Sequence, residues 1–500
     1  MYLIDQAENF GHQVALECDE RSINYGPLLD QAQSLAADLI KDQDDLESAR
    51  IVSLLSPSID YVVLQWAVWL AGGVFVPLTA KSSDEELGFL FDDIEPTIIV
   101  VDEEEKDRLS AISKRYEIKS VNDFNIVSQN KLPSVDSHRP CMLLYTSGTT
   151  GKPKGVVVTH SNLEAQIKSL QEAWGWSQKD KTVLTLPLYH VHGNVNILCC
   201  ALASGSNCKI HSRFDPEAVW NEFRNGDLTL FMAVPTIYAK LMEWYDNVNS
   251  NEQMKLSKAV SNLRLTVSGS APLSTSLFER WHEISGHTML ERYGMTETGM
   301  ILSNPLNGAR RKGAVGQPLP GVTVKLVDDK LQEVATGESG EVLVKGKNVF
   351  SEYWKRSKET DASFHQGWFR TGDLAVNEDG DYRLLGRLSQ DIIKTGGHKV
   401  SALEIEEVLR EHPDIKDASV VSIHDDMWGE IVCAAVTPQS DLLSDKRLLE
   451  WSKGYFISHK RPRRVLIMEN FPRNSLGKVI KSELRKKFER SSEMESKDDT

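Results

Sequence analysis

The stretch YTSGTTGKPKG, residues Tyr145–Gly155, has the composition of a loop that binds phosphate groups. It lies between two apolar segments, MLLY and VVVTH, which predict strands. Its glycines and small hydroxyl residues let backbone N–H groups approach an anion closely, while Lys152 and Lys154 add positive charge. It is not a Walker loop, because only two residues separate Gly148 from Gly151 and a proline follows the lysine. A flexible hairpin turn is the alternative, but a turn does not need this many glycines, hydroxyls and lysines.

Short β-branched apolar runs alternate with amphipathic segments on both sides of this loop. Such alternation is typical of α/β layers built around largely parallel sheets. The pattern predicts strands at residues 50–55, 74–77, 96–102, 228–233 and 262–268, and helices at 59–70, 215–224, 235–244 and 274–285.

The pattern changes after residue 318, where short alternating segments with turn residues between them predict antiparallel strands. From residue 403 it changes again, to a compact α+β unit. A chain of 500 residues is also too long for one ordinary hydrophobic core. We therefore expect an α/β fold with a large multi-layer N-terminal domain, residues 1–387, which contains α/β sheets and a small β-barrel-like part. A smaller α+β C-terminal domain, residues 388–500, should follow.

Composition and charge argue against several classes of protein. Lys and Arg number 57 against 72 Asp and Glu, which gives a net charge of −15 and disfavours binding to nucleic acid or anionic lipid. No run reaches the roughly 18 apolar residues of a membrane span, so we expect no stable membrane insertion. The six cysteines form no CxxC pair, which indicates neither a disulfide framework nor a zinc site. We expect a cytoplasmic protein, or a mitochondrial one if a presequence was removed.

The loop at Tyr145–Gly155 is similar to the phosphate loop of the adenylate-forming superfamily of acyl-CoA synthetases, luciferases and peptide-synthetase adenylation domains. The resemblance continues through further motifs that occur in the family's order. These motifs are LPLYH (Leu186–His190), SGSAP (Ser268–Pro272), YGMTE (Tyr293–Glu297), WFRTGD (Trp368–Asp373), Gly386–Arg387, KTGG (Lys394–Gly397) and PRNSLGK (Pro472–Lys478).

The resemblance implies a two-step reaction with ATP, Mg²⁺ and CoA. ATP converts a carboxylic acid into an acyl-adenylate and pyrophosphate, and the CoA thiolate then displaces AMP. The C-terminal domain of the family is mobile, and it presents Lys478 for the first step and the segment Lys394–Val400 for the second. The pivot corresponds to Ser389, where many relatives carry Asp or Lys. The partners implied are small molecules, namely the acid, ATP and CoA, and the protein is expected to be a monomer or a homodimer.

The resemblance also implies a role for each matching residue. Tyr293 should stack on adenine, Asp373 and Arg387 should meet the ribose, and Thr296 should contact phosphate. Glu297 should hold Mg²⁺, which prefers carboxylate oxygens. The implied ATP-binding residues are Thr146, Ser147, Gly148, Thr149, Thr150, Gly151, Lys152, Lys154, Ser270, Ala271, Pro272, Tyr293, Gly294, Met295, Asp373 and Arg387. The implied catalytic residues are Lys478, Thr296, Glu297 and His190, and those of the CoA step are Lys394, Gly396, Gly397 and His398.

The identity of the carboxylic acid is predicted from the sequence of the pocket. The segments around His190–Gly193 and Leu290–Thr298 look like those of the malonyl-CoA synthetase branch. Arg292 precedes the stacking tyrosine, a position where many relatives carry a small or uncharged residue. A guanidinium matches a carboxylate bidentately, so Arg292 with His192 and Ser268 should bind the far carboxylate of a short diacid, which we expect to be malonate. The alternative is that Arg292 faces outward and pairs with a neighbouring glutamate, either Glu291 or Glu297.

Several other activities are compatible with the family resemblance. The alternative acids are methylmalonate, oxalate and a short- or medium-chain fatty acid, and the alternative acceptor of the acyl group is the thiol of a carrier protein. A nucleotide binder without turnover is a further alternative, although the intact Lys478, Glu297 and Lys394–Gly397 argue against it. Light emission has no positive support in the sequence.

Overall fold

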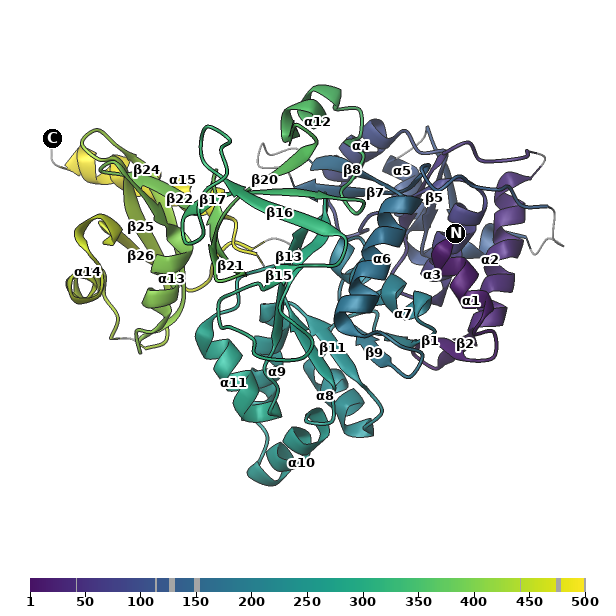
Figure 1. The fold of residues 1–500 in the computed structure, drawn as a ribbon, viewed down its shortest axis with the longest axis horizontal. Coiled ribbons are helices and arrows are strands. Elements are labelled where there is room, and N and C mark those ends of the chain that lie inside the picture. The colour runs from purple at the N-terminus through teal and green to yellow at the C-terminus, as the bar shows by residue number, and fades with distance from the viewer. Residues whose placement is uncertain are drawn as a thin grey trace.

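The computed structural model describes residues 1–41, 43–112, 115–125, 131–147, 153–440, 442–473 and 478–498. These residues form four sheets with helices packed on them, which is the α/β architecture predicted (Figure 1). Each strand and helix predicted by range between residues 50 and 285 is present, and the ends differ by at most three residues.

A seven-stranded sheet carries the phosphate loop. Its central strands are parallel, whereas the two strands that flank the loop, β7 and β8, form an antiparallel pair. In sheet order the strands are β18 (Glu352–Tyr353), β8 (Pro153–Thr159), β7 (Pro140–Ser147), β4 (Val74–Pro77), β3 (Arg50–Leu54), β5 (Ile98–Val101) and β6 (Glu117–Ser120).

A nine-stranded sheet carries the motifs SGSAP and YGMTE. Its six central strands are parallel, and antiparallel strands close both edges. In sheet order the strands are β15 (Gln317–Pro318), β14 (Gly299–Ser303), β13 (Leu290–Met295), β12 (Leu265–Ser268), β11 (Leu230–Ala233), β9 (Lys181–Leu184), β10 (Asn207–Ile210), β1 (Val14–Cys18) and β2 (Arg21–Asn24).

Helices fill the space between these two sheets and cover their outer faces. One apolar core joins both sheets to the helices between them, and a second core lies between the seven-stranded sheet and α4 and α5. The inner helices are α2 (Tyr25–Ile40), α3 (Ile59–Leu70), α6 (His160–Trp174), a π-helix (His192–Cys199) and α7 (Cys200–Ala203), with α1 (Tyr2–Glu8) beside them. The outer helices are α4 (Asp84–Ile94) and α5 (Lys106–Ile112) on one sheet and α8 (Pro216–Asn225), α9 (Pro235–Asp246), α10 (Ser250–Val260) and α11 (Thr275–Ser285) on the other.

Local sequence explains where the helices begin and end. The Ser58 side chain accepts a hydrogen bond from the backbone N–H of Tyr61 and so caps the first turn of α3. Helix α8 begins after Asp215, whose side chain caps it, and stops at Gly226. Gly226 has a φ of 80°, a left-handed conformation that favours glycine and ends a helix.

The part predicted to be barrel-like is an antiparallel five-stranded sheet. The C-terminal domain follows it in the chain. The sheet contains β16 (Val322–Val327), β17 (Ser339–Gly346), β20 (Trp368–Glu378), β19 (Phe364–His365) and β21 (Asp381–Arg387), with α12 (Ser357–Ser363) beside it. The C-terminal sheet contains β23 (His398–Ser401), β22 (Ile392–Thr395), β25 (Gly429–Pro438), β24 (Ile415–Asp425) and β26 (Arg464–Ile467). One of its faces packs on α13 (Ala402–Arg410) and α14 (Asp445–Tyr455), and the other on α15 (Lys481–Asp498).

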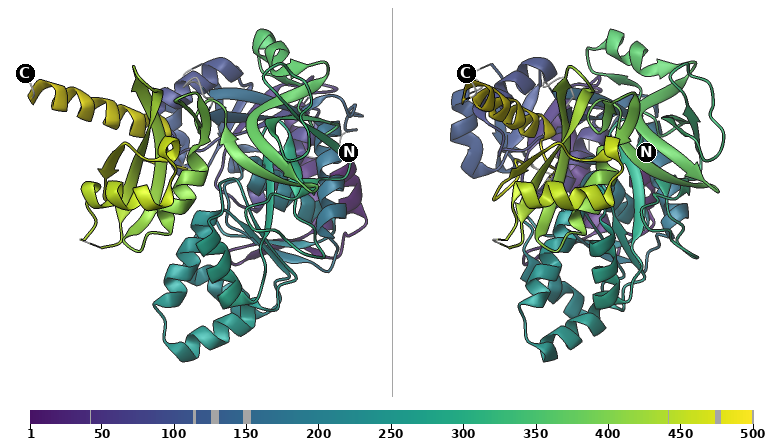
Figure 2. Two further views of the ribbon diagram at one scale, coloured as in Figure 1. Left: turned by 60° about the vertical axis from the view of Figure 1, so that its left-hand side comes forward. Right: turned by 90° about the vertical axis from the view of Figure 1, so that its left-hand side faces the viewer.

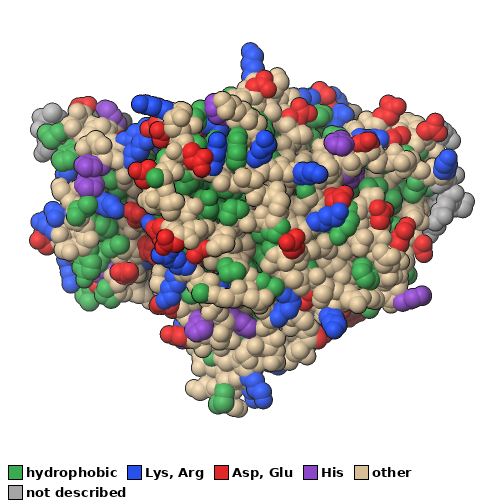
Figure 3. Space-filling view, in the orientation of Figure 1, with side chains coloured by type: hydrophobic (Ala, Val, Ile, Leu, Met, Phe, Trp, Pro, Cys, Tyr) green, Lys and Arg blue, Asp and Glu red, His purple; other side chains and the backbone are tan. Residues whose placement is uncertain are grey.

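The C-terminal domain forms a separate lobe in Figure 1 and in the left view of Figure 2. The chain leaves the five-stranded sheet at Arg387 and enters the C-terminal sheet at Ile392, so Ser389 lies in the connection. That Ser389 is the pivot stays a prediction. Acidic and basic side chains are interspersed over the face shown in Figure 3. Within the described ranges, no helix combines the length and apolar character needed to cross a membrane.

Candidate active site

The residues predicted to form the acyl pocket meet where two parallel strands end. Strands β12 and β13 are neighbours, with Ser268 opposite Glu291, so the turn after Ser268 lies beside Arg292. Ligands bind at this edge in many α/β sheets, because the carboxyl ends of parallel strands and their loops converge there. The structure therefore brings together Ser268 and Arg292, as predicted from the motifs.

Arg292 points inward and is only 3% exposed. Its Nη2 donates a hydrogen bond to Ser270 Oγ at 3.2 Å, while its Nε has no hydrogen-bond partner in the described part of the chain. Burial lowers the pKa of the guanidinium to about 9, because the charged form loses its hydration. The outward-facing alternative is wrong, because the side chain is buried and no carboxylate among the described residues pairs with it. Glu297 instead accepts a hydrogen bond from Tyr353.

Gly269 makes room for this guanidinium. A Cβ atom at this position would lie 2.7 Å from Arg292 Cζ, which is closer than side-chain carbons approach one another. The next residue, Ser270, has a φ of 69°, an unusual conformation for a residue other than glycine. Such conformations cost energy and cluster at functional sites. The backbone is thus shaped around Arg292.

Ser270 also joins Arg292 to a histidine. Its Oγ lies 3.2 Å from Nδ1 of His192, which begins the π-helix. Burial, and then the positive charge of Arg292, lower the pKa of His192 well below its usual value, so the ring is neutral. Ser270 Oγ accepts from Arg292 and still has one hydrogen to donate and one lone pair to accept with, so it can pair with either neutral form of the His192 ring. Nε2 is buried and, like Ser268 Oγ, has no partner among the residues described.

Two further predicted residues lie at this pocket. Ser270, predicted to bind the nucleotide, has its hydroxyl against His192 and Arg292, and its role toward the nucleotide stays a prediction. His190 lies nearby; burial, and then the charge of Lys478, lower its pKa to about 4. His190 is therefore neutral at physiological pH, and its Nε2 has no partner within the described segments.

Residues predicted to bind the nucleotide form a second cluster, next to the first. Tyr293 is buried, and its hydroxyl donates to Asp373 Oδ2. Arg387 donates to both Asp373 oxygens, at 2.8 and 3.2 Å. A carboxylate has about four acceptor positions, so Asp373 can accept further hydrogen bonds from hydroxyl groups. Of the other predicted residues, Ala271, Gly294, Met295 and Thr296 are half-buried, and Pro272 is exposed.

Glu297 lies beside this cluster and is 7% exposed. Its Oε1 accepts a hydrogen bond of 2.8 Å from the Tyr353 hydroxyl. Burial raises the pKa of Glu297, and the Tyr353 hydrogen bond partly offsets this. The described residues contain no cluster of three or more His, Cys, Asp or Glu suited to a metal ion. A lone carboxylate still fits Mg²⁺, which is usually bound by one or two carboxylates together with substrate phosphates and water.

The phosphate loop is described only at its two ends. Thr146 and Ser147 end β7, and Lys154 lies on β8, where it forms an ion pair with Glu359 and lies over the Tyr353 ring. The predicted residues Gly148, Thr149, Thr150, Gly151 and Lys152 lie outside the described residues.

Lys478 comes from the C-terminal domain and lies at the site. Burial, then the charge of Arg387, lower its pKa, and Arg292 lowers it further. The residue is nevertheless exposed to solvent. Two further contacts hold the lobe in this position: Thr275 donates to Glu407, and Lys399 pairs with Asp329 at 2.7 Å.

The residues predicted for the CoA step are not at this site in the present arrangement. Lys394, Gly396, Gly397 and His398 belong to the exposed β22–β23 hairpin. His398 stacks on His459 at 4.1 Å between ring centroids. The structure thus brings Lys478 together with the acyl and nucleotide residues and leaves the hairpin outside.

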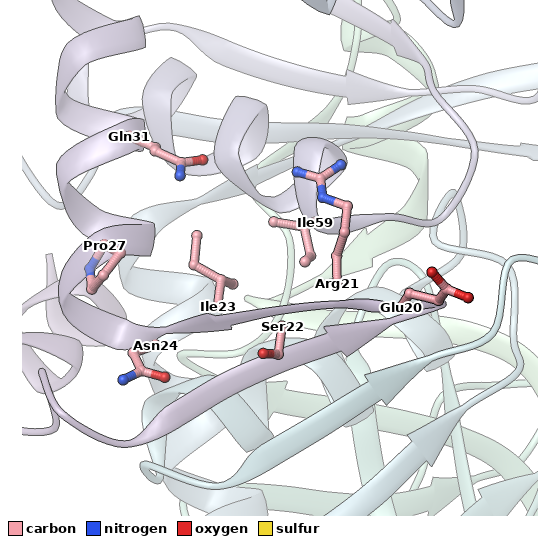
Figure 4. Close-up of a pocket in the computed structure, with 8 residues that line it drawn as sticks. All are labelled: Glu20, Arg21, Ser22, Ile23, Asn24, Pro27, Gln31 and Ile59. Carbon is pink, nitrogen blue, oxygen red and sulfur yellow. The ribbon is translucent and has the colours of Figure 1, made fainter.

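A surface hollow of about 630 Å³ lies elsewhere, beside the edge strand β2 (Figure 4). Arg21, Ile23 and Gln31 are among its lining residues, and none of the predicted site residues line it. Arg21 pairs with Asp60 at 2.8 Å. The hollow is therefore separate from the candidate active site.

Two residues of the site were missed by sequence reasoning. Gly269 lies within the recognised SGSAP motif, and its role became visible only from its distance to Arg292. Tyr353 is far from YGMTE in sequence and reaches Glu297 through the pairing of β18 with β8. No local pattern marks Tyr353 as a partner of Glu297.

Comparison with known proteins places this geometry in a family. The family model described as AMP-binding enzyme matches residues 3–354, and the one described as AMP-binding enzyme C-terminal domain matches residues 404–478. Malonate–CoA ligase ACSF3, mitochondrial, from Mus musculus is 41% identical, with 96% of this chain and 89% of that protein covered.

Two solved structures are similar over nearly the whole chain. ATP-bound MatB from Rhodopseudomonas palustris has a TM-score of 0.89 at 30% identity, with 97% of this chain and 98% of that chain covered. A malonyl-CoA ligase in a ternary product complex with methylmalonyl-CoA and AMP has a TM-score of 0.68 at 35% identity, with 93% and 97% covered. The chain belongs to the AMP-binding enzyme family, as the motifs predicted.

Proposed function

We propose that this protein is an ATP-dependent ligase that joins malonate to CoA through a malonyl-adenylate, with release of pyrophosphate and AMP. The observation that carries the proposal is Arg292, a buried cation that no described carboxylate neutralises. A distal carboxylate of the substrate would supply the missing negative charge through a charge-assisted hydrogen bond. The hydroxyl of Ser268 and the Nε2 atom of His192 are unpartnered in the described part of the chain and would complete the site.

The remaining residues support adenylation of the other carboxylate. Tyr293, Asp373 and Arg387 would hold adenosine, and Glu297 would hold Mg²⁺ against the ATP phosphates. Mg²⁺ would neutralise charge on these phosphates when bound. Lys478 would stabilise the negative charge that builds on the carboxylate and the α-phosphate oxygens during transfer. Neutral His190 adds no competing positive charge beside Lys478.

The arrangement of the domains favours the first of the two steps. Lys478 lies near Arg292 and Arg387, whereas the β22–β23 hairpin is exposed. The protein resembles the ATP-bound relative more than the product complex, with TM-scores of 0.89 and 0.68, although the product complex is the more similar in sequence. Such a reversal is expected if the two relatives differ in domain arrangement.

One assay tests the proposed function. Purified protein is incubated with ATP, Mg²⁺ and CoA and a panel containing malonate, methylmalonate, oxalate, succinate, butyrate and octanoate, and CoA-dependent AMP formation is measured. Malonate should give the highest kcat/KM, and omission of CoA should stop turnover after the adenylate forms. A higher kcat/KM for butyrate or octanoate would overturn the diacid assignment, and a preference for methylmalonate or oxalate would replace malonate by that acid.

The cellular compartment follows less directly. The expected cytoplasmic location stays a prediction. The mouse relative is named as a mitochondrial protein, which favours the mitochondrial alternative. Fractionation of cells that express the natural full-length protein, with antibody detection in cytosol and mitochondria, distinguishes the two.

A further inference from the structure

One short segment holds both the backbone and the side chain of Glu297. The backbone N–H of Phe350 donates to the Glu297 carbonyl at 2.8 Å, and Asn348 Nδ2 donates to the carbonyl of Thr298 at 2.6 Å. Tyr353, three residues beyond Phe350, donates its hydroxyl to Glu297 Oε1 at 2.8 Å. These three hydrogen bonds fix where the carboxylate lies and how it is turned.

The same tyrosine contacts the strand that leaves the phosphate loop. Tyr353 belongs to β18, where it pairs with Val156 of β8. The Nζ atom of Lys154, also on β8, lies 5.5 Å from the centre of the Tyr353 ring. Cation–π contact of this kind is attractive and directional. Tyr353 therefore touches the phosphate-loop strand with its ring and the Glu297 carboxylate with its hydroxyl.

We propose that Tyr353 is a positioning residue that orients Glu297 for the metal ion of the ATP complex and holds that carboxylate at a fixed position relative to the phosphate loop. This inference rests on the proposed role of Glu297 as the Mg²⁺ ligand. The hydroxyl occupies Oε1, which directs the other carboxylate oxygen toward a cation. Outer partners of metal ligands commonly change metal affinity by about 10- to 100-fold when they are removed.

The test separates ATP binding with metal from ATP binding without it. Calorimetry measures the Kd of ATP in excess Mg²⁺ and in EDTA, without acid or CoA, so no turnover is involved and the identity of the acid is irrelevant. Tyr353→Phe should weaken binding of Mg–ATP by about tenfold or more and leave binding of metal-free ATP within about twofold. Tyr382→Phe is the matched control, because Tyr382 is a buried tyrosine of the same apolar cluster that does not contact Glu297.

Glu297→Gln distinguishes the two levels of the proposal. It should abolish most of the advantage of Mg–ATP over ATP, and Tyr353→Phe should add nothing in that background. The quantity to compare is the Kd of ATP in EDTA divided by its Kd in Mg²⁺. If Glu297→Gln lowers this ratio but Tyr353→Phe leaves it within about twofold of the parent, the role of Tyr353 is overturned and the metal role of Glu297 stands. If Glu297→Gln has no effect, both are overturned.

A purely structural role gives a different result. Tyr353→Phe would then weaken ATP with and without metal equally and lower the melting temperature, which overturns the proposal. Should Tyr353→Phe fail to fold, Tyr353→His takes its place, because it keeps a ring but cannot place a hydroxyl at Oε1. If the ratio of the two Kd values, in EDTA and in Mg²⁺, stays within about twofold of the parent in that variant, the proposal is overturned as well.

Discussion

Replacement of Arg292 by alanine tests the central feature of the pocket. The guanidinium is 3% exposed, and burial lowers its pKa to about 9, so it is charged at pH 7.5 and lacks a described carboxylate partner. Breaking a buried charge pair by removing one partner costs about 3–5 kcal/mol. In Arg292→Ala the distal carboxylate of malonate would be left in this position, so kcat/KM for malonate should fall by about 100- to 4,000-fold at about 1.4 kcal/mol per decade.

The competing acid should respond in the opposite direction. Butyrate has no distal carboxylate and leaves the Arg292 charge unmatched in the parent, so removal of the charge should hold or raise its kcat/KM. Folding should not suffer from the loss of charge, because an unpaired buried cation is itself unfavourable. Thermal unfolding of the variant checks that the loss of activity is not a loss of structure.

The assay is kcat/KM for malonate and butyrate, measured by AMP formation, together with the Kd of ATP. Arg21→Ala is the control: Arg21 pairs with Asp60 beside the hollow of Figure 4, outside the site, and such surface pairs contribute little. ATP affinity should stay within about twofold in both variants. Malonate activity that survives Arg292→Ala within about threefold, or a parallel fall for both acids, would refute the carboxylate role of Arg292.

Three further results are expected. Gly269→Ala places a Cβ atom 2.7 Å from Arg292 Cζ, so malonate kcat/KM should fall by about tenfold or more while ATP affinity is unchanged; equal malonate activity in the variant would contradict the close packing. Lys478→Ala should abolish adenylate formation, measured by pyrophosphate exchange, and spare the attack of CoA on supplied malonyl-adenylate. Gly397→Val should spare adenylate formation and impair the CoA step. Equal loss of both half-reactions in either variant would contradict the assignment of Lys478 and Gly397 to different domain positions. Because the pKa of Arg292 is about 9, the pocket keeps its charge below that pH and loses it above; the ratio of malonate to butyrate kcat/KM should therefore decline as pH rises through about 9, and a flat ratio up to pH 10 would count against it.

The elements of the fold were predictable because their signals are local. Helix α3 has a serine cap and a largely apolar sequence, interrupted by Asp60 and Gln65, and its predicted bounds match the structure. Strand β12 begins at Leu265, three residues later than predicted, because the preceding residues Asn262 to Arg264 bond outside the strand ladder. Ends of elements depend on tertiary hydrogen bonds that local patterns do not contain.

The orientation of site residues was not predictable in the same way. Whether Arg292 faces inward depends on the alignment of β12 with β13 and on the space above Gly269, which are properties of two strands together. The contact of Ser270 with His192 likewise depends on a left-handed backbone at Ser270 and on the start of the π-helix. The motif indicated that these residues share a site, and only the folded chain shows which of them touch.

The position of Arg292 in the fold also bears on how a reactive intermediate would be retained. Lys478 belongs to the C-terminal domain, so under the predicted domain movement it would leave when the β22–β23 hairpin approaches for the CoA step. Arg292 lies on β13 of the N-terminal domain and contacts Ser270 of the same domain. A diacid would therefore meet two cations during adenylation, and the malonyl-adenylate would keep the one at its distal carboxylate while the domain turns. A mono-acid lacks that second attachment, so the discrimination supplied by Arg292 should act in both half-reactions, whereas that of Lys478 is confined to the first.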